Sequence, residues 1–158
     1  MAASWEPPKF ALSSVVYLER DGRILLLKRA AGSAMAGQWF LPGGAVDPGE
    51  QPEEAARREL VEESGLEVAG ELEMVGCYTM WLYGHDFLQL SFRGRAGAGD
   101  PVVSAEHDGA RWVDPVEMRA FLTDEVIDAM AGGDERITIG VRRVRDDLDR
   151  YLRRAGLA

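Results

Sequence analysis

The chain has 158 residues, of which 46% are apolar, and it carries a formal net charge of −9 at pH 7. This acidity argues against binding to DNA or RNA polymers, which needs a basic surface, and against adsorption to anionic membranes. The apolar share predicts a globular core, and no apolar run approaches the roughly 20 residues that cross a bilayer.

The only cysteine, Cys77, excludes an internal disulfide and fits a reducing compartment. The first ten residues lack the basic and then apolar layout of a signal peptide. Both observations favour a cytoplasmic protein. Valine and tyrosine neighbours indicate that Cys77 lies on a strand, where we expect a buried thiol and not a nucleophile.

The first residues predict an irregular arm followed by a hairpin. Pro7-Pro8 marks residues 1–9 as irregular, and residues 10–18 are predicted to form a strand. Asp21-Gly22 is a strong turn signal, so residues 23–28 form the returning strand. The continuous apolar run of this second strand predicts a central position in the sheet, with both faces covered.

A loop of small residues over 30–37 leads to a glycine-rich bend and then to a helix. Pro42-Gly43-Gly44 allows the backbone to turn sharply and to approach a metal or a phosphate closely. Pro52 suits the first turn of a helix, where no amide donor is needed, and Gly65 occupies the place of a left-handed C-terminal cap. These signals predict a helix between the two residues.

Three glutamates of this helix are predicted to share one face. At about 100° per residue, Glu59, Glu62 and Glu63 fall within an arc of roughly 100°. Their repulsion costs roughly 0.2–0.5 kcal/mol for each i,i+3 or i,i+4 pair, and Arg58 offsets part of it. A hard cation such as Mg²⁺ offsets more, because it prefers carboxylate, water and phosphate oxygens. The helical pattern alone leaves a solvated acidic face as the alternative.

The rest of the chain predicts strands and then helices. Residues 66–82 indicate one long or kinked strand, and the alternation that begins at Leu88 indicates its hairpin partner. A glycine-rich surface loop over 94–100 is followed by a short strand over 110–113. Helices are expected over 115–121 and 124–130.

The tail over 136–155 is predicted to be an amphipathic helix with an arginine-rich outer face. We expect its apolar face to pack on the core, with a homodimer surface as the alternative. Neither repeats nor a long linker divide the chain, so we expect a single domain over 1–158.

The segment from Gly44 to Leu66 carries a spaced set of residues that resembles the Nudix box. That box is a glycine, five residues, Glu, seven residues, and then Arg-Glu-aliphatic-any-Glu-Glu-any-Gly-aliphatic. Every specified position is matched, by Gly44, Glu50, Arg58, Glu59, Leu60, Glu62, Glu63, Gly65 and Leu66. The preceding Trp39-Phe40-Leu41-Pro42-Gly43 also resembles the family's approach to the box.

The resemblance to Nudix (MutT-like) hydrolases implies a fold and a reaction. The fold is α/β, an α/β/α sandwich around a mixed sheet. The reaction is hydrolysis, dependent on Mg²⁺ or Mn²⁺, of a nucleoside diphosphate linked to another moiety, such as a nucleoside triphosphate or a dinucleoside polyphosphate. Water attacks at phosphorus. The expected partner is a small nucleotide, and neither a nucleic acid polymer nor a membrane.

The resemblance also assigns roles within the box. The metal ligands correspond to Glu59, Glu62 and Glu63, and a carbonyl of Gly43 or Gly44 joins them. The general base corresponds to Glu59 or to a carboxylate outside the box. The remaining box residues include Arg58, which pairs with Glu50 to steady the helix and its loop, and the structural glycines Gly44 and Gly65.

Residues outside the box complete the predicted site. Many family members use one more acidic residue in the loop before a later tryptophan-bearing strand, and we choose Glu106 over Asp108 for this role. The resemblance places Arg29 opposite substrate phosphate. The aromatic candidates for stacking on a base are Trp39 and Tyr83, with Phe40, Tyr78 and Trp112 as further options. We expect His85 and His107 on the surface.

Two alternatives stay open at this point. One is a catalytically silent nucleotide-sensing module that keeps the fold, although such modules usually lack box glutamates and none is missing here. The other is the isoprenoid diphosphate isomerase branch, which requires a catalytic cysteine, so that Cys77 would have to face the site.

Overall fold

The computed structural model describes residues 6–157. The predicted irregular arm over 1–9 lies partly outside this range, and residues 6–10 belong to no helix or strand. Within the described range, no helix combines the length and the apolar character needed to cross a membrane.

The strands of the described chain form one seven-stranded mixed sheet. They are β1 (Ala11–Arg20), β2 (Arg23–Arg29), β3 (Trp39–Phe40), β4 (Gly43–Ala45), β5 (Val68–Leu82), β6 (His85–Ala96) and β7 (His107–Val113). The hydrogen-bonded order is β3-β2-β1-β6-β5, while β4 pairs with β1 and β7 pairs with β2. The β1–β6 pair is parallel and the other pairs are antiparallel.

Strand β1 changes its partner along its length. Near its C-terminal end it pairs with β2, through Glu19 with Ile24 and Arg20 with Arg23. Nearer its N-terminal end the same edge pairs with β4, through residues 13–15. Strand β2 instead continues alongside β7 as far as Arg29 and His107. This arrangement places β4, the end of β2 and the start of β7 around one region of the sheet.

Tight turns join the two predicted hairpins. Asp21 and Gly22 have φ values of 50° and 72°, which are the positive angles of a two-residue hairpin turn. Tyr83 and Gly84, with φ values of 52° and 80°, close the β5–β6 hairpin in the same way. The hairpin predictions are confirmed. Tyr83 is a bulky residue in a left-handed backbone conformation, and this conformation is locally strained.

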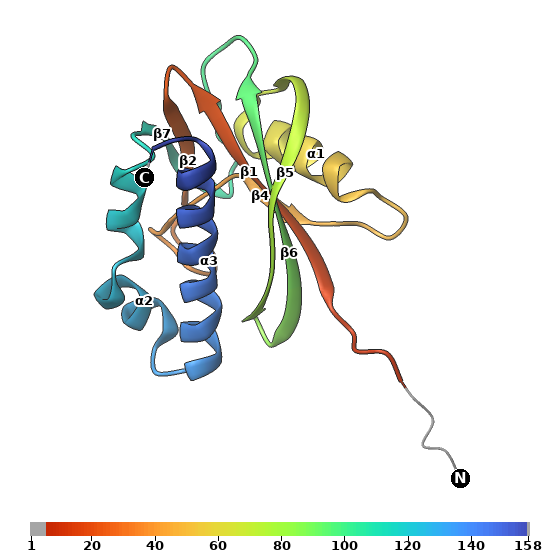
Figure 1. The fold of residues 1–158 in the computed structure, drawn as a ribbon, viewed down its shortest axis with the longest axis vertical. Coiled ribbons are helices and arrows are strands. Elements are labelled where there is room, and N and C mark those ends of the chain that lie inside the picture. The colour runs from red at the N-terminus through yellow and green to blue at the C-terminus, as the bar shows by residue number, and fades with distance from the viewer. Residues whose placement is uncertain (1–5, 158) are drawn as a thin grey trace.

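Strand β2 is covered on both faces, as its sequence predicts. Leu25 and Leu27 lie in a buried cluster on the side of helix α1 (Pro52–Ser64), and Ile24 and Leu26 lie in a second cluster on the opposite side. The second cluster includes Leu148 of helix α3 (Glu135–Arg154). Figure 1 shows α1 on one side of the sheet and α3 on the other. This is the predicted α/β/α arrangement.

Helix α1 begins and ends where its sequence signals place it. Gln51 and Glu54 form a capping box at its N-terminus, and Pro52 occupies the first turn. Gly65 has a φ of 68° and its N–H donates to the carbonyl of Val61. Ala56 and Leu60 are fully buried against the sheet, and Glu63 on the same side of the helix is buried as well, whereas Glu62 is exposed.

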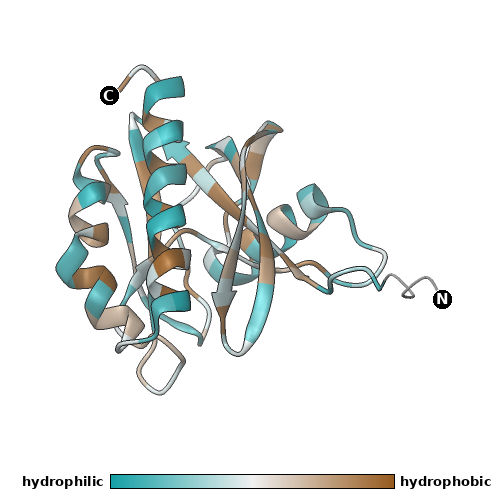
Figure 2. Cartoon of the chain, turned by 60° about the horizontal axis from the view of Figure 1, so that its bottom comes forward, coloured by the Kyte–Doolittle hydropathy of each residue, from teal (hydrophilic) through white to brown (hydrophobic). Residues whose placement is uncertain are grey.

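The C-terminal elements cover the other face. A 3-10 helix, η1 (Glu117–Leu122), stands where an α-helix over 115–121 was predicted, followed by α2 (Asp124–Ala131) and α3. Helix α3 packs on β5 and stacks Tyr151 on Tyr17, with ring centroids 4.3 Å apart. Figure 2 shows the largely hydrophilic outer side of α3.

Two expectations are wrong. The loop predicted over 94–100 begins later, because Arg95 and Ala96 pair with Ala69 and Val68 and extend β6. Cys77 lies on a strand but is exposed and not buried. Strand β5 is at the edge of the sheet, and register shifts on both sides of Glu73 and Met74 interrupt its alternation.

Candidate active site and its carboxylates

Arg58 connects helix α1 to the loop in front of it. Its Nε and Nη2 atoms donate to the two carboxylate oxygens of Glu50, each at 2.9 Å, and Nη2 also donates to the carbonyl of Ala45 at 3.0 Å. Its Nη1 donates to Glu59 at 2.7 Å and to Glu62 at 3.3 Å. A bidentate arginine–carboxylate pair fixes geometry as well as charge. Arg58 therefore fixes the position of Glu59 relative to the β4 backbone.

The hydrogen bonds between Arg58 and Glu50 contribute to the free energy of unfolding in a way that depends on pH. The hydrogen bonds from Arg58, and then the N–H of Asp47, lower the pKa of Glu50 from 4.5 to about 2. Because the pKa is lower in the folded state, the unfolded chain binds the proton more tightly, so this stabilisation is present above pH 4.5 and is lost as the pH falls towards 2. We expect the difference in unfolding free energy between the wild type and Glu50→Gln to shrink over that window.

Urea titrations of both proteins at several pH values between 2 and 7 measure this difference. Glu53→Gln is the matched control, because the ion-pair partner of Glu53 within the described part of the chain is the exposed Arg57, on the outer side of α1. A Glu50→Gln difference that stays constant from pH 6 to pH 2 would contradict the prediction.

The two glycines before the box allow a close approach of backbone and carboxylates. Gly43 has a φ of 151°, and a Cβ atom there would collide with the backbone of Ser14 and Val15. A Cβ atom on Gly44 would lie 2.5 Å from the carboxylate carbon of Glu59. The N–H of Gly43 donates to Glu63 at 2.8 Å. The contact that Gly43 makes here is therefore through its amide, whereas the resemblance implied a carbonyl.

Glu63 is the most buried of the box carboxylates, with 7% of its surface exposed. Burial raises its pKa to about 7, and the negative charges of Glu59 and Glu106 add to this, while the Gly43 N–H and Arg29 oppose it. Glu59, Glu63 and Glu106 line the same cavity, so their negative charges are close together. A divalent cation would relieve their mutual repulsion, because hard cations prefer such oxygen donors.

The carboxylates are suitable ligands for a divalent metal, but in this structure their oxygens do not point to one shared position. Among residues 6–157, no three acidic, histidine or cysteine side chains are close enough together to form a ligand set. Glu62 and Glu106 have side chains that are 59% and 69% exposed and accept long hydrogen bonds, each at 3.3 Å, from Arg58 and Arg29. Glu59 and Glu63 are more buried and are held by shorter hydrogen bonds, at 2.7 and 2.8 Å.

The end of β2 and the start of β7 complete this region. Arg29 Nη1 lies 3.3 Å from Glu106, and its Nε is buried without a hydrogen-bond partner in the described structure. Glu106 lies at the site, whereas Asp108 accepts a hydrogen bond from the N–H of Ala31 and holds the neighbouring loop. Of the two acidic candidates in this loop, Glu106 therefore lies at the site and Asp108 does not.

His107 is buried, which corrects the expectation of a surface histidine. Its Nε2 lies 3.6 Å from Glu63 and its Nδ1 lies 3.4 Å from the hydroxyl of Ser104. The carbonyl of Glu63 accepts the N–H of Ser104, so the loop is attached to the end of α1. Burial lowers the pKa of His107. His85 is exposed, as expected.

A cavity of about 530 Å³ extends from these charged groups under α3. Such a volume lies within the usual range for small-molecule sites. The cavity brings together most of the predicted site residues, namely Arg29, Trp39, Gly43, Gly44, Glu59, Glu63, Tyr83 and Glu106. Phe40 and Tyr78 also line it. Arg58, Glu62, Glu50 and Gly65 lie outside its lining, as do Trp112 and Cys77.

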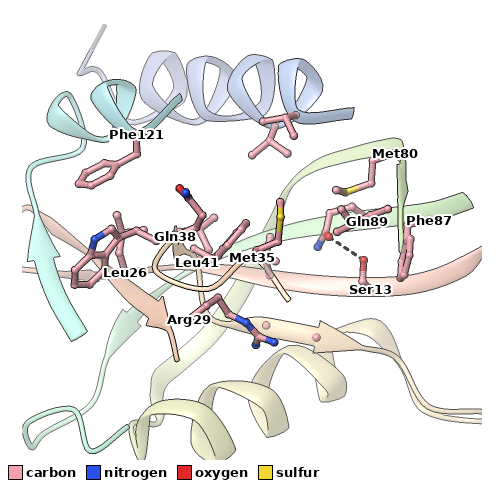
Figure 3. A pocket seen from close by; sticks show the side chains of 18 of the residues that line it. Ser13, Leu26, Arg29, Met35, Gln38, Leu41, Met80, Phe87, Gln89 and Phe121 are labelled. Carbon is pink, nitrogen blue, oxygen red and sulfur yellow. Dashed lines mark hydrogen bonds between the residues drawn. The ribbon is translucent and has the colours of Figure 1, made fainter. Parts of the chain in front are cut away.

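The sequence did not single out several cavity residues. Figure 3 shows Ser13, Gln89, Phe87, Met80 and Phe121 around the same space, from three distant parts of the chain. The alternation in β6 identified the strand, but it did not reveal that the polar Gln89 is buried, with 6% of its surface exposed. Only knowledge that α3 covers this face could have done so.

Comparison with known proteins agrees with this geometry. The NUDIX domain family model matches residues 9–131. A MutT-like protein of Streptomyces ambofaciens is 31% identical over 80% of this chain and 80% of its own length. The nucleoside triphosphatase NudI of Salmonella paratyphi B is 31% identical over 66% of this chain and 82% of its own.

Among solved structures, the MutT protein from Methanosarcina mazei Go1 is 28% identical and aligns with a TM-score of 0.62. The alignment covers 94% of this chain and 98% of that protein. The family model, the full set of box residues and the shared fold agree, and the chain belongs to the Nudix hydrolase family.

Proposed function

We propose that this protein hydrolyses a phosphoanhydride bond of a nucleotide, with a nucleoside triphosphate as the first candidate. The observation that carries the proposal is the cavity itself. One end is lined by the carboxylates of Glu59, Glu63 and Glu106 together with Arg29, and the rest is largely apolar and aromatic. A nucleotide has the same division, between charged phosphates and a planar base.

The residues at the charged end of the cavity would have different roles in hydrolysis. Glu59, Glu62, Glu63 and Glu106 would hold the divalent cation, for which Mg²⁺ is the first choice and Mn²⁺ the second. When bound, the cation supplies neutralisation of the charge on the phosphate oxygens. Arg29 adds a positively charged guanidinium at the same place, because it lines the cavity and its Nη1 lies 3.3 Å from the exposed Glu106.

The reaction needs a water molecule that loses its proton to a carboxylate. The water oxygen forms a bond to phosphorus, the bridging P–O bond breaks, and the leaving phosphate takes the bond electrons. Glu59 is our choice for the base, because its carboxylate lies against Gly44 and is oriented by Arg58. Glu106 is the alternative outside the box.

A nucleoside triphosphate is favoured by the similarity to a relative that is named as a nucleoside triphosphatase. The aromatic side chains of Trp39 and Tyr83 line the cavity and would contact the base and the sugar. In this proposal the binding partner is a small molecule, the nucleotide substrate.

Chromatographic analysis of products tests the proposal. The panel contains nucleoside triphosphates, dinucleoside polyphosphates, nucleotide sugars and ADP-ribose, each with Mg²⁺, with Mn²⁺ or with EDTA. We expect metal-dependent release of nucleoside monophosphate or diphosphate from the triphosphates, and reaction in ¹⁸O-labelled water to identify the attacked phosphorus. Nucleotide binding without turnover of any compound would instead support the silent sensing module.

A further inference from the structure

Ser13 and Gln89 form a polar pair inside the otherwise apolar half of the cavity. The Ser13 hydroxyl donates to Gln89 Oε1 at 2.8 Å, and the dashed line in Figure 3 marks this bond. Both residues are more than nine-tenths buried, and both line the cavity. They face each other across the parallel β1–β6 pair.

The pair leaves hydrogen-bonding capacity unused. Gln89 Nε2 makes one long contact, 3.4 Å to the carbonyl of Leu90, so its second hydrogen has no partner in the described structure. Gln89 Oε1 accepts from Ser13 and keeps a second lone pair. The free donor and the free acceptor belong to a side chain that lines a cavity of about 530 Å³, which has room for a small molecule. The open face of the amide therefore points to a ligand.

The position of the pair suits the base of a nucleotide. Gly43 and Gly44 of β4 lie beside β1, and Gln89 of β6 lies beside β1 on its other edge. Two strand spacings, about 10 Å, therefore separate the charged end from the amide. A sugar separates the phosphates from the base in a nucleotide and spans a gap of this kind.

Apolar side chains beside Gln89 provide a surface for a planar ring. Phe87 lies two residues before Gln89, on the same face of β6, and Met80 of β5 lies opposite Phe87. Aromatic rings and methionine sulfur both pack well on a heterocycle. An amide at the edge of such a surface can form two hydrogen bonds with a base, as glutamine does with adenine.

We propose that Gln89, oriented by Ser13, determines base specificity by binding the edge of the nucleobase where a donor and an acceptor are adjacent. This inference rests on the proposed function, because it assumes a nucleotide in the cavity. Ser13 is a positioning residue, since its hydroxyl fixes the orientation of the amide.

The test compares kcat and KM for ATP, GTP, CTP and UTP in the wild type, Gln89→Met and Ser13→Ala. Methionine keeps the length of glutamine and suits an apolar cavity. We expect the wild type to prefer at least one base, and Gln89→Met to reduce that preference about 10- to 100-fold, mainly through KM. Ser13→Ala should reduce it less, and circular dichroism verifies that each variant is folded.

Ser14→Ala and Ser91→Ala are the matched controls. Both remove a fully buried hydroxyl from the same two strands, and neither residue lines the cavity. They should leave the ratios between bases unchanged. Equal kcat/KM for all four bases in the wild type, ratios that survive in Gln89→Met, or equal loss in the controls would each overturn the proposal.

Calorimetric binding of the four nucleoside monophosphates in EDTA separates this proposal from the proposed function. A base preference in binding that Gln89→Met removes would support the role of Gln89 even if the wild type hydrolyses no triphosphate. Absence of any base preference in binding and in turnover would overturn it.

Discussion

Replacing Glu59 with glutamine is expected to lower kcat about 10²- to 10⁴-fold, the range for removal of a general base. The change keeps the shape of the side chain, and the amide oxygen can still accept from Arg58 Nη1, which lies 2.7 Å away in the wild type. The fold should therefore survive while the negative charge is lost. Steady-state kinetics on the best substrate, at saturating Mg²⁺, measure the effect.

Metal binding then tests whether Glu59 holds the cation in addition to acting as the base. If Glu59 is the base alone, the affinity for Mn²⁺ measured by calorimetry should change little while kcat falls. If it is also a metal ligand, the affinity should fall together with kcat. Glu106→Gln is the informative partner variant, because Glu106 is the other candidate base.

Glu53→Gln serves as the control for Glu59→Gln, because it removes a carboxylate from the same helix. Glu53 lies on the outer side, where it pairs with Arg57 at 3.0 Å, and exposed pairs of this kind contribute little to stability. A kcat for Glu59→Gln within threefold of that control would remove Glu59 from the catalytic machinery.

The sequence predicted the charged end of the cavity better than the apolar end, for a physical reason. Glu59, Glu62 and Glu63 lie within one helix, so the helical period alone brings them to one face. The start of that helix at Pro52 and its end at Gly65 also depend on single residues with strong local preferences. Local rules therefore predicted this part of the site.

The apolar end is assembled from residues that are distant in sequence. Ser13 and Gln89 are 76 positions apart and meet only because β1 and β6 pair in parallel. No local pattern encodes that register. The alternation around Gln89 predicted a strand with a polar face, but Gln89 is buried and lines a cavity together with residues of α3.

The errors on His107 and Cys77 have the same origin. His107 was expected on the surface, yet β7 begins at this residue and pairs it with Arg29 of β2, next to Glu63. Cys77 was expected in the core, yet β5 is an edge strand with an interrupted register. In both cases the neighbours across the sheet, and not the neighbours in sequence, determine the exposure.

The second large effect is expected for Arg58→Lys, which should lower kcat/KM about 10- to 100-fold, as loss of a partner that orients metal ligands does. Lysine keeps the charge but has one nitrogen, whereas Arg58 uses three to reach Glu50, Glu59, Glu62 and the Ala45 carbonyl. A single ammonium cannot hold Glu59 in place and bind Glu50 through two bonds at once. The freed carboxylates would repel each other and weaken metal binding.

Arg57→Lys provides a control with the same chemical change one position away. Among residues 6–157, the hydrogen-bond partners of the Arg57 side chain are Glu53 and the carbonyl of Gly70, on the outer side of α1. Kinetics, Mn²⁺ affinity and thermal unfolding of the two variants should therefore differ, with a loss of activity and of metal affinity confined to Arg58→Lys. Equal effects of the two substitutions would mean that the several hydrogen bonds of Arg58 are not needed for activity or metal binding. Loss of stability in Arg58→Lys with unchanged kcat/KM would restrict Arg58 to holding the fold, because the orientation of Glu59 would then be independent of it.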